Sequence, residues 1–226
     1  MLYFRDKCTG CGKCKEVCPQ ELVECTLCGA CTERCPTGAR RICGGEKSVA
    51  DVMRPILQDV PFYGDDGGAT FSGGECMLQI DFLNTLLEEC KKNGIHTAVD
   101  TAGCVPWAHF ERILPNVDLF LYDVKCADED LHREVTGVSN RLILENLRLL
   151  CDRADVLVRI PVIPGVNADE AEMRRIATLL APLNTVGVEL LPYHRLGVNK
   201  FLALGREGRS FSVPTDEEMR KLREMF

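Results

Sequence analysis

Eight cysteines near the start of the chain are the feature that most limits what it can fold into and bind. They form two consecutive copies of the pattern CxxCxxCxxxCP, which are Cys8, Cys11, Cys14 and Cys18-Pro19, then Cys25, Cys28, Cys31 and Cys35-Pro36. Three thiolates at this close spacing can surround one face of an iron–sulfur cubane, while the fourth thiolate reaches a second cluster. The sequence therefore predicts two [4Fe-4S] clusters whose fourth ligands are exchanged between the two motifs.

The exchange assigns four cysteines to each cluster: Cys8, Cys11, Cys14 and Cys35 to one, and Cys25, Cys28, Cys31 and Cys18 to the other. A pair of zinc sites and a disulfide knot are the alternatives. Zinc modules usually take their cysteines as two separated CxxC pairs, and a secreted disulfide scaffold is expected to carry a signal peptide, which these residues do not show. The doubled pattern with both prolines resembles the bacterial ferredoxin motif.

The chain is long enough to fold a large domain beyond this motif. Of its 226 residues, 46% are hydrophobic, so we expect a ferredoxin-like domain at residues 1–45 and a main domain at residues 46–226. The formal charge of -7 and the isoelectric point near 5.2 argue against nucleic acid or an anionic membrane as partners. No apolar run reaches the length of a membrane span. These features predict a cytoplasmic protein.

Six further cysteines are scattered singly, and we expect most of them to be small core residues rather than ligands. They are Cys43, Cys76, Cys90, Cys104, Cys126 and Cys151.

Alternating helical and strand-like segments follow Gly44-Gly45 and predict βα units with a parallel sheet. Helical periodicity covers residues 48–60, 82–90 (ended by Asn93-Gly94) and 176–183. Strands are predicted at residues 69–71, 96–99, 119–122, 156–160 and 186–191.

Polar or glycine-rich residues follow each predicted strand. In chain order they are Ser72-Gly73-Gly74-Glu75, Asp100-Thr101, Asp123 with Lys125, Arg159-Ile160-Pro161 and Pro192-Tyr193-His194. Because the carboxyl ends of parallel barrel strands share one rim, where such folds bind ligands, we expect these groups to gather there. Taken singly, each residue could equally be a strand-end ion pair or a turn glycine. Five such groups in succession favour a binding site.

The ordered motifs resemble those of the glycyl-radical-enzyme activating enzymes, which belong to the radical S-adenosylmethionine (SAM) superfamily. The resemblance runs from Leu2 to about Leu204. It rests on the doubled cysteine motif and on residues 70–75, 100–103, 118–125, 159–167 and 190–197. It implies an α/β fold, an incomplete (β/α)6 barrel of the partial TIM-barrel type, with a two-cluster ferredoxin insert.

The resemblance also implies roles for the strand-end residues. Gly73, Gly74 and Glu75 hold the SAM amino group, Lys125 and Arg159 face its carboxylate or ribose, and His194 contacts the adenosyl end. Asp100, Thr101 and Asp123 form a monovalent-cation site, where hard oxygen ligands suit the ion. Ser72 and Val124 complete the cofactor-binding set.

The reaction implied by the resemblance is an anaerobic oxidoreductase step. SAM gives a 5'-deoxyadenosyl radical, which removes a hydrogen atom from a glycine of a large partner, the glycyl radical enzyme. A flavodoxin or a ferredoxin would donate the electron.

The CxxxCxxC loop that binds the radical cluster in this family is not found in the sequence. Cys14 and Cys18 would need a third cysteine where Glu21 stands, and Cys31 and Cys35 would need one where Gly38 stands. We therefore expect an N-terminally truncated copy that lacks the first barrel strand, the catalytic cysteines and the third [4Fe-4S] cluster of a full-length form. Such a copy would be inactive as written. The alternative is a short electron-transfer or SAM-binding module without radical chemistry.

Overall fold

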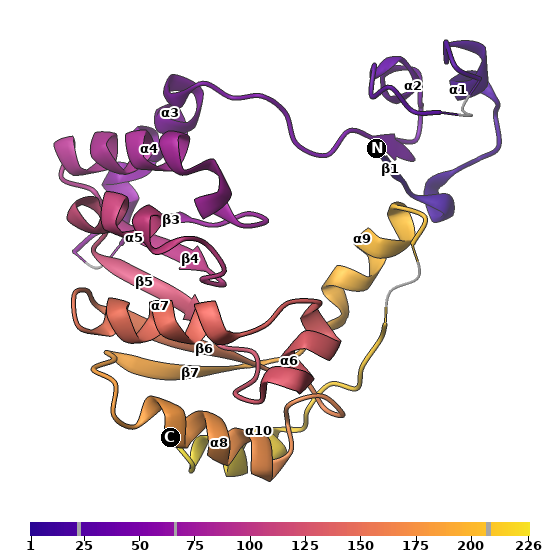
Figure 1. Ribbon diagram of the computed structural model, residues 1–226. Coiled ribbons are helices and arrows are strands. Elements are labelled where there is room, and N and C mark those ends of the chain that lie inside the picture. Colours follow the sequence, from indigo (N-terminus) through magenta and orange to yellow (C-terminus); the bar gives the residue numbers. More distant parts are fainter. Residues whose placement is uncertain (22–23, 66, 207–208) are drawn as a thin grey trace. The chain divides into compact units, whose positions relative to one another are not determined.

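The computed structural model describes residues 1–21, 24–65, 67–206 and 209–226, which form two compact units (Figure 1). The smaller unit contains Met1–Glu46 and His194–Phe211, and the larger contains Lys47–Tyr193 and Ser212–Phe226. The segment His194–Phe211, which we expected within the barrel domain, is thus grouped with the cysteine-rich segment.

The larger unit is built on a parallel sheet of five strands in sequential order, as predicted. The strands are β3 (Gly68–Phe71), β4 (His96–Thr101), β5 (Leu119–Asp123), β6 (Val156–Val162) and β7 (Gly187–Pro192). Each strand pairs in parallel with the next, and β3 and β7 are the two edges. All the carboxyl ends therefore lie along one border of the sheet, which is the rim that the sequence predicted.

Helices follow the strands, and α4, α5, α7 and α8 lie along the same side of the curved sheet (Figure 1). The helices of this unit are α3 (Val49–Tyr63), α4 (Ile80–Lys92), α5 (Trp107–Ile113), α6 (Glu129–Thr136), α7 (Arg141–Cys151), α8 (Glu170–Leu180) and α10 (Asp216–Arg223), with short 3-10 turns η2 (Cys76–Gln79) and η3 (Leu114–Asn116). Helix α3 begins at a capping box of Ser48 and Asp51, which satisfies free amides of the first turn.

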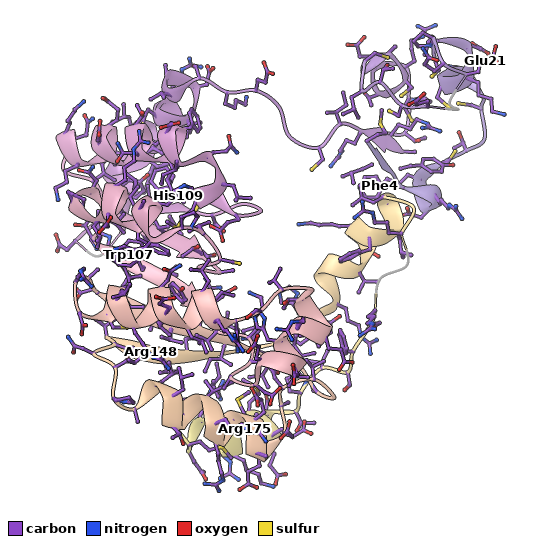
Figure 2. The ribbon with its side chains drawn as sticks, viewed as in Figure 1. Phe4, Glu21, Trp107, His109, Arg148 and Arg175 are labelled. Carbon is purple, nitrogen blue, oxygen red and sulfur yellow. The ribbon has the colours of Figure 1, made fainter. Side chains whose placement is uncertain are left out.

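The two faces of the sheet differ in burial. Along β6 the residues Val156, Val158, Ile160 and Val162 are fully buried, whereas the alternating residues Leu157, Arg159 and Pro161 are half-buried. The buried face packs on the helical layer, where Phe110 of α5 lies 6.2 Å from Tyr122, measured between ring centroids. Trp107 begins the same helix and stacks on Phe110 at 5.6 Å (Figure 2). On the opposite face of the sheet, the polar side chain of Arg159 is only half-buried, so it can contact a ligand.

The smaller unit repeats one local structure twice. Helix α1 (Lys13–Glu16) follows Gly12, and α2 (Ala30–Glu33) follows Gly29; both glycines have a left-handed backbone, with φ of 75° and 84°. Each glycine comes directly after the second cysteine of its motif, so the sequence repeat is also a structural repeat.

An antiparallel pair of short strands, β1 (Leu2–Tyr3) and β2 (Arg40–Arg41), joins the two ends of the cysteine-rich segment. The remaining elements of this unit are η1 (Arg5–Lys7), η4 (Arg195–Gly197) and α9 (Val198–Ala203), the last of which contacts β1.

Three of the six scattered cysteines are core residues as expected, because Cys90, Cys126 and Cys151 are buried. Cys76 is half-buried. Cys43 and Cys104 are exposed, so half of the six cysteines, rather than most of them, are buried in the core. Among the described residues, no helix is both long and apolar enough to cross a membrane.

Candidate cluster sites and strand-end rim

Four cysteines from the two motifs line one cavity of the smaller unit. They are Cys8, Cys11 and Cys14 from the first motif and Cys35 from the second, and Tyr3, Thr37 and Arg40 lie beside them. These are the four cysteines that the spacing assigned to one cluster, and their role as ligands stays a prediction.

The environment of two of these thiols, Cys35 and Cys8, favours the thiolate form that binds iron. Hydrogen bonds from the backbone of Arg40 and from the Thr37 hydroxyl lower the pKa of Cys35 to about 7. The Thr37 hydroxyl lies 3.7 Å from the Cys35 sulfur. A hydrogen bond from Tyr3 lowers the pKa of Cys8, with the backbone of Gly10 adding to the effect. Thiolates rather than thiols are metal ligands, so both shifts prepare the cavity for a cluster.

Three cysteines of the second set, Cys18, Cys25 and Cys31, influence one another electrostatically. Burial raises the pKa of Cys31, and the negative charges of Cys18 and Cys25 raise it further. Cys18 therefore neighbours cysteines of the second motif, while Cys35 neighbours those of the first.

The donor set fits a cluster better than a single ion. None of the 14 cysteines forms a disulfide, and among residues 1–21, 24–65, 67–206 and 209–226 no three His, Cys, Asp or Glu side chains could hold one metal ion. The four thiols surround a cavity instead of meeting at a point, and a cubane needs that arrangement because each thiolate binds a different iron. Arg40 also lines the cavity, and its Nε atom is buried and has no hydrogen-bond partner.

At the rim of the larger unit, Asp100 connects residues from three strand ends. Its Oδ2 atom accepts a hydrogen bond from the Ser72 hydroxyl at 3.1 Å and lies 3.1 Å from Nη1 of Arg159. Arg159 also lies 3.9 Å from the Glu189 carboxylate, measured from its Nε. That Nε atom is buried without a hydrogen-bond partner, so it could donate to a ligand at the rim.

Glu75 holds the loop after β3 against the end of β4. Its Oε1 atom accepts from the Thr101 hydroxyl at 2.9 Å and from the Met77 amide at 3.2 Å, and its Oε2 accepts from the Ala102 amide at 2.9 Å. The neighbouring Gly73 has φ of 142°, which side chains rarely adopt, and both Gly73 and Gly74 are exposed. The loop therefore exposes the backbone of Gly73 and Gly74 beside the carboxylate of Glu75, which its hydrogen bonds hold in place.

Lys125 lies next to Asp123, with 3.3 Å between Nζ and Oδ2. The side chain of Val124 between them is buried in the core, and its amide donates to the Arg159 carbonyl at 2.9 Å. The whole residue is only 1% exposed, so the structure does not present Val124 to a ligand. His194 lies in the smaller unit, where it is exposed.

The three residues predicted as a cation site have other partners. Asp100 pairs with Arg159, Thr101 with Glu75, and Asp123 with Lys125. In this arrangement their oxygens are neutralised by cations or held by hydrogen bonds.

Buried asparagines that the sequence analysis did not single out as functional hold the rim in shape. Asn167 donates to the carbonyls of Lys125 and Pro161, both at 2.7 Å, which joins the ends of β5 and β6. Asn146 donates to the carbonyls of Gly103 and Val105 at 2.9 and 2.8 Å. Asparagine inside a buried segment is the only sequence signal for this role, because buried amides need partners.

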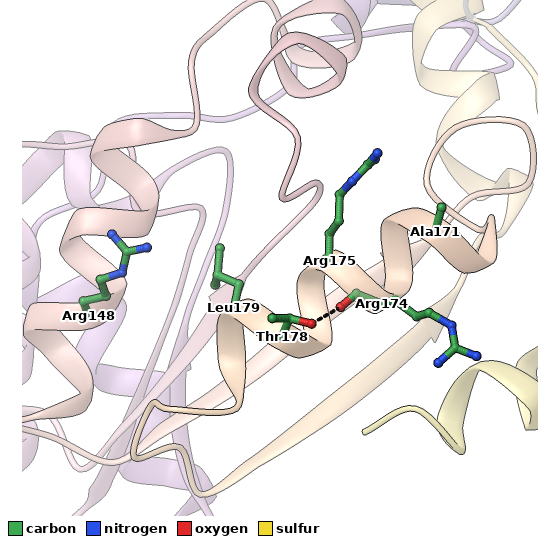
Figure 3. Close-up of a pocket in the computed structure, with 6 residues that line it drawn as sticks. All are labelled: Arg148, Ala171, Arg174, Arg175, Thr178 and Leu179. Carbon is green, nitrogen blue, oxygen red and sulfur yellow. Dashed lines mark hydrogen bonds between the residues drawn. The ribbon is translucent and has the colours of Figure 1, made fainter.

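One further hollow, of about 440 Å³, lies on the outer helical layer between α7 and α8 (Figure 3). It is lined by Arg148, Ala171, Arg174, Arg175, Thr178 and Leu179. Arg174 pairs with Glu170 and Arg175 with the buried Glu172, so two of the three arginines already have acidic partners. None of the predicted site residues lines this hollow, which we take to be ordinary helix surface.

Comparison with known proteins identifies the family. The radical SAM superfamily matches residues 18–177, and a 4Fe-4S binding domain matches residues 2–24. The chain is 40% identical over 245 residues to the trans-4-hydroxy-L-proline dehydratase activating enzyme of Clostridioides difficile, covering 100% of this chain and 81% of that protein. It is 46% identical over 186 residues to the isethionate sulfite-lyase activating enzyme of Nitratidesulfovibrio vulgaris, covering 79% of this chain and 60% of that protein.

A solved structure shares the fold. A domain of pyruvate-formate lyase-activating enzyme from Bacteroides vulgatus has 33% sequence identity and a TM-score of 0.59, covering 70% of this chain and 91% of that one. The matched family, the relatives and the fold favour an activating enzyme over an electron-transfer module. The chain therefore belongs to the glycyl-radical-enzyme activating enzymes of the radical SAM superfamily.

Proposed function

We propose that this chain binds two [4Fe-4S] clusters and SAM, and that it activates a glycyl radical enzyme only when a CxxxCxxC segment, which these 226 residues do not contain, supplies the radical cluster. In the complete reaction one electron and one SAM give methionine and a 5'-deoxyadenosyl radical. That radical takes a hydrogen atom from a glycine of the partner, leaving 5'-deoxyadenosine and a glycyl radical. The observation that carries the proposal is the cavity lined by Cys8, Cys11, Cys14 and Cys35 in a chain with a radical SAM sheet.

The two clusters, when bound, can each accept and release one electron. The two sets of cysteines, each with its fourth member from the other motif, support two clusters. The residues around each cluster determine its reduction potential. A reduced flavodoxin or ferredoxin is the electron donor in this proposal.

SAM binds at the rim in this proposal, and charge supports that location. Arg159 and Lys125 supply positive charge for the methionine carboxylate, and the Nε of Arg159, which makes no hydrogen bond within the protein, offers it one. The exposed backbone of Gly73 and Gly74 offers close approach for the amino group, and His194 is assigned to the adenosyl end.

A monovalent cation beside the SAM carboxylate is part of the proposal. Asp100 is the second-last residue of β4 and Asp123 is the last residue of the neighbouring β5, and both provide oxygen ligands, which such ions prefer. The cation would then take the place that Arg159 and Lys125 have beside these carboxylates, so SAM binding should depend on potassium concentration.

The test compares two ligands that differ in the methionine part. Binding of SAM and of methylthioadenosine, which lacks the methionine carboxylate, is measured by calorimetry for wild type, Lys125→Ala, Arg159→Gln and His194→Ala. Lys125→Ala and Arg159→Gln should weaken SAM at least tenfold with little effect on methylthioadenosine, whereas His194→Ala should weaken both. Lys221→Ala on α10, whose charge pairs with Glu217, is the control. Equal loss of iron and of folded protein would show that these side chains are structural.

A further inference from the structure

Arg40 has an unusual position for a charged side chain. It lines the cavity of Cys8, Cys11, Cys14 and Cys35, and its Nε atom is buried without a hydrogen-bond partner. A buried N–H without a partner is costly, and each such atom in a folded protein needs an explanation. A group that fills the cavity would supply the missing acceptor.

The β1–β2 pair fixes the direction of this side chain. Tyr3 and Arg40 are directly opposite each other in the pair, and the guanidinium carbon lies 4.8 Å from the centre of the Tyr3 ring. A planar guanidinium held against an aromatic face loses little additional freedom when it donates a hydrogen bond. The β1–β2 pair thus places Tyr3 where it hydrogen-bonds Cys8, and it places Arg40 in the lining of the same cavity.

The charge of Arg40 acts on cysteines of both sets. Burial of the guanidinium opposes its charged form, but the pKa of Arg40 is nevertheless raised, because a hydrogen bond to Cys14 and the charges of Cys14 and Cys31 outweigh that cost. Arg40 therefore interacts most directly with the set that contains Cys14, and through charge alone with the set that contains Cys31.

We propose that Arg40 sets the reduction potential of the cluster held by Cys8, Cys11, Cys14 and Cys35, by donating its Nε–H to a sulfur of that cluster. This inference rests on the proposed binding of two clusters. A cluster with four thiolates becomes more negative when it accepts one electron from the reduced flavodoxin or ferredoxin. A fixed cation and an N–H donor stabilise the reduced form more than the oxidised form, and so raise the potential.

The consequence is an asymmetry between two clusters whose cysteine motifs are nearly identical. The cluster beside Arg40 should be the easier one to reduce, and so should hold the electron in the singly reduced protein.

The experiment is a redox titration followed by electron paramagnetic resonance on anaerobically reconstituted chain. Arg40→Gln removes the charge and is expected to make one cluster at least tenfold harder to reduce, a shift of about 59 mV for one electron. Arg40→Lys keeps the charge without the Nε–H, so it should lower the potential by a smaller amount. Arg41→Gln is the matched control, because Arg41 is the next residue of the same strand and is exposed.

Cys35→Ser assigns the signals, because the cluster whose spectrum it changes is the one beside Arg40. The larger shift in Arg40→Gln should belong to that cluster. Unchanged potentials in a variant with full iron content would overturn the inference, as would a larger shift in the other cluster. If Arg40→Gln does not retain iron, Arg40→Lys becomes the test, and an unchanged reduction potential in that variant contradicts the proposed hydrogen bond from Nε. Loss of iron from both variants would show that Arg40 has a structural role and would overturn the inference. Wild type without two cubanes would instead contradict the proposed function.

Discussion

Arg159 of β6 pairs with Asp100 of β4 at 3.1 Å, although β5 runs between their strands. The residue directly opposite Arg159 on β5 is Asp123, which pairs instead with Lys125. The rim therefore carries two separate ion pairs, and each consists of one carboxylate and one cation. Each side chain of the Asp100–Arg159 pair is only 23% exposed, so the charges are partly protected from water.

This pair should be measurable as a coupling energy. Asp100→Asn and Arg159→Gln should each lower the free energy of unfolding by about 1–3 kcal/mol, because each leaves a partly buried charge without its partner. The double variant should lose less than the sum of the two, with a coupling of about 0.5–3 kcal/mol. Urea denaturation of the four proteins measures this. Strict additivity would mean that the two residues act independently.

Cluster content follows from the two sets of cysteines. Anaerobically reconstituted chain should hold about eight iron atoms, as two cubanes that become paramagnetic on reduction. Because the fourth ligands cross, Cys35→Ala should damage the cluster of the first motif, and Cys18→Ala that of the second. Iron analysis and paramagnetic resonance of each variant test this. Four irons in wild type, or zinc in their place, would contradict the two-cluster proposal.

Gly103 should be far less tolerant of substitution than another glycine with the same backbone. Its φ is 71°, and a Cβ atom there would lie 1.8 Å from the Tyr122 hydroxyl, which donates to the Ile143 carbonyl at 2.7 Å. Gly103→Ala should therefore lower the free energy of unfolding by about 2–5 kcal/mol, from backbone strain and overpacking together. Gly137 has φ of 84° and open space, so Gly137→Ala should cost only the strain, about 1–2 kcal/mol. Equal losses in denaturant titrations would contradict the packing argument.

The strands and the rim could be predicted because they depend on local patterns. Runs of apolar residues between helical segments located all five strands with nearly the observed bounds, and parallel pairing then placed their polar ends together. Helix α5 has only seven residues, too few to show clear periodicity, and was not predicted. Strand β6 continues through Pro161 to Val162, beyond its predicted end.

What could not be predicted depends on contacts between distant residues. Asn167 joins two strand ends through carbonyls of Lys125 and Pro161, and nothing in its own neighbourhood marks that role. Glu172 is buried and accepts from the amide of Asp128, far away in the chain. The association of α9 with β1, which groups residues 194–211 with the cysteine motifs, has the same origin.

Alkylation should separate the six scattered cysteines into two classes. Burial raises the pKa of Cys76 and Cys126 to about 12, and that of Cys90 and Cys151 to about 11. At pH 8 their thiolate fractions are then at most about one in a thousand, and thiolates are the reactive form. Iodoacetamide at pH 8 should label the exposed Cys43 and Cys104 in the cluster-loaded protein and leave the other four unmodified. Labelling in denaturant, read by mass spectrometry, is the control. Cys76 reacting as fast as Cys104 would contradict its burial.

The 226-residue chain by itself should not cleave SAM reductively. SAM must chelate an iron that has only three protein ligands, whereas each of the two proposed cubanes would have four cysteines and would leave no iron open. The sequence contains no CxxxCxxC loop that could hold another cluster. The loaded chain, incubated with SAM and dithionite, should give no 5'-deoxyadenosine above a control without clusters, while a form extended by a CxxxCxxC segment should give product. Chromatography of the quenched mixture detects the nucleoside. Product from the 226-residue chain would mean that one cubane releases a cysteine to SAM, and the assignment of four cysteines to each cluster would then be wrong.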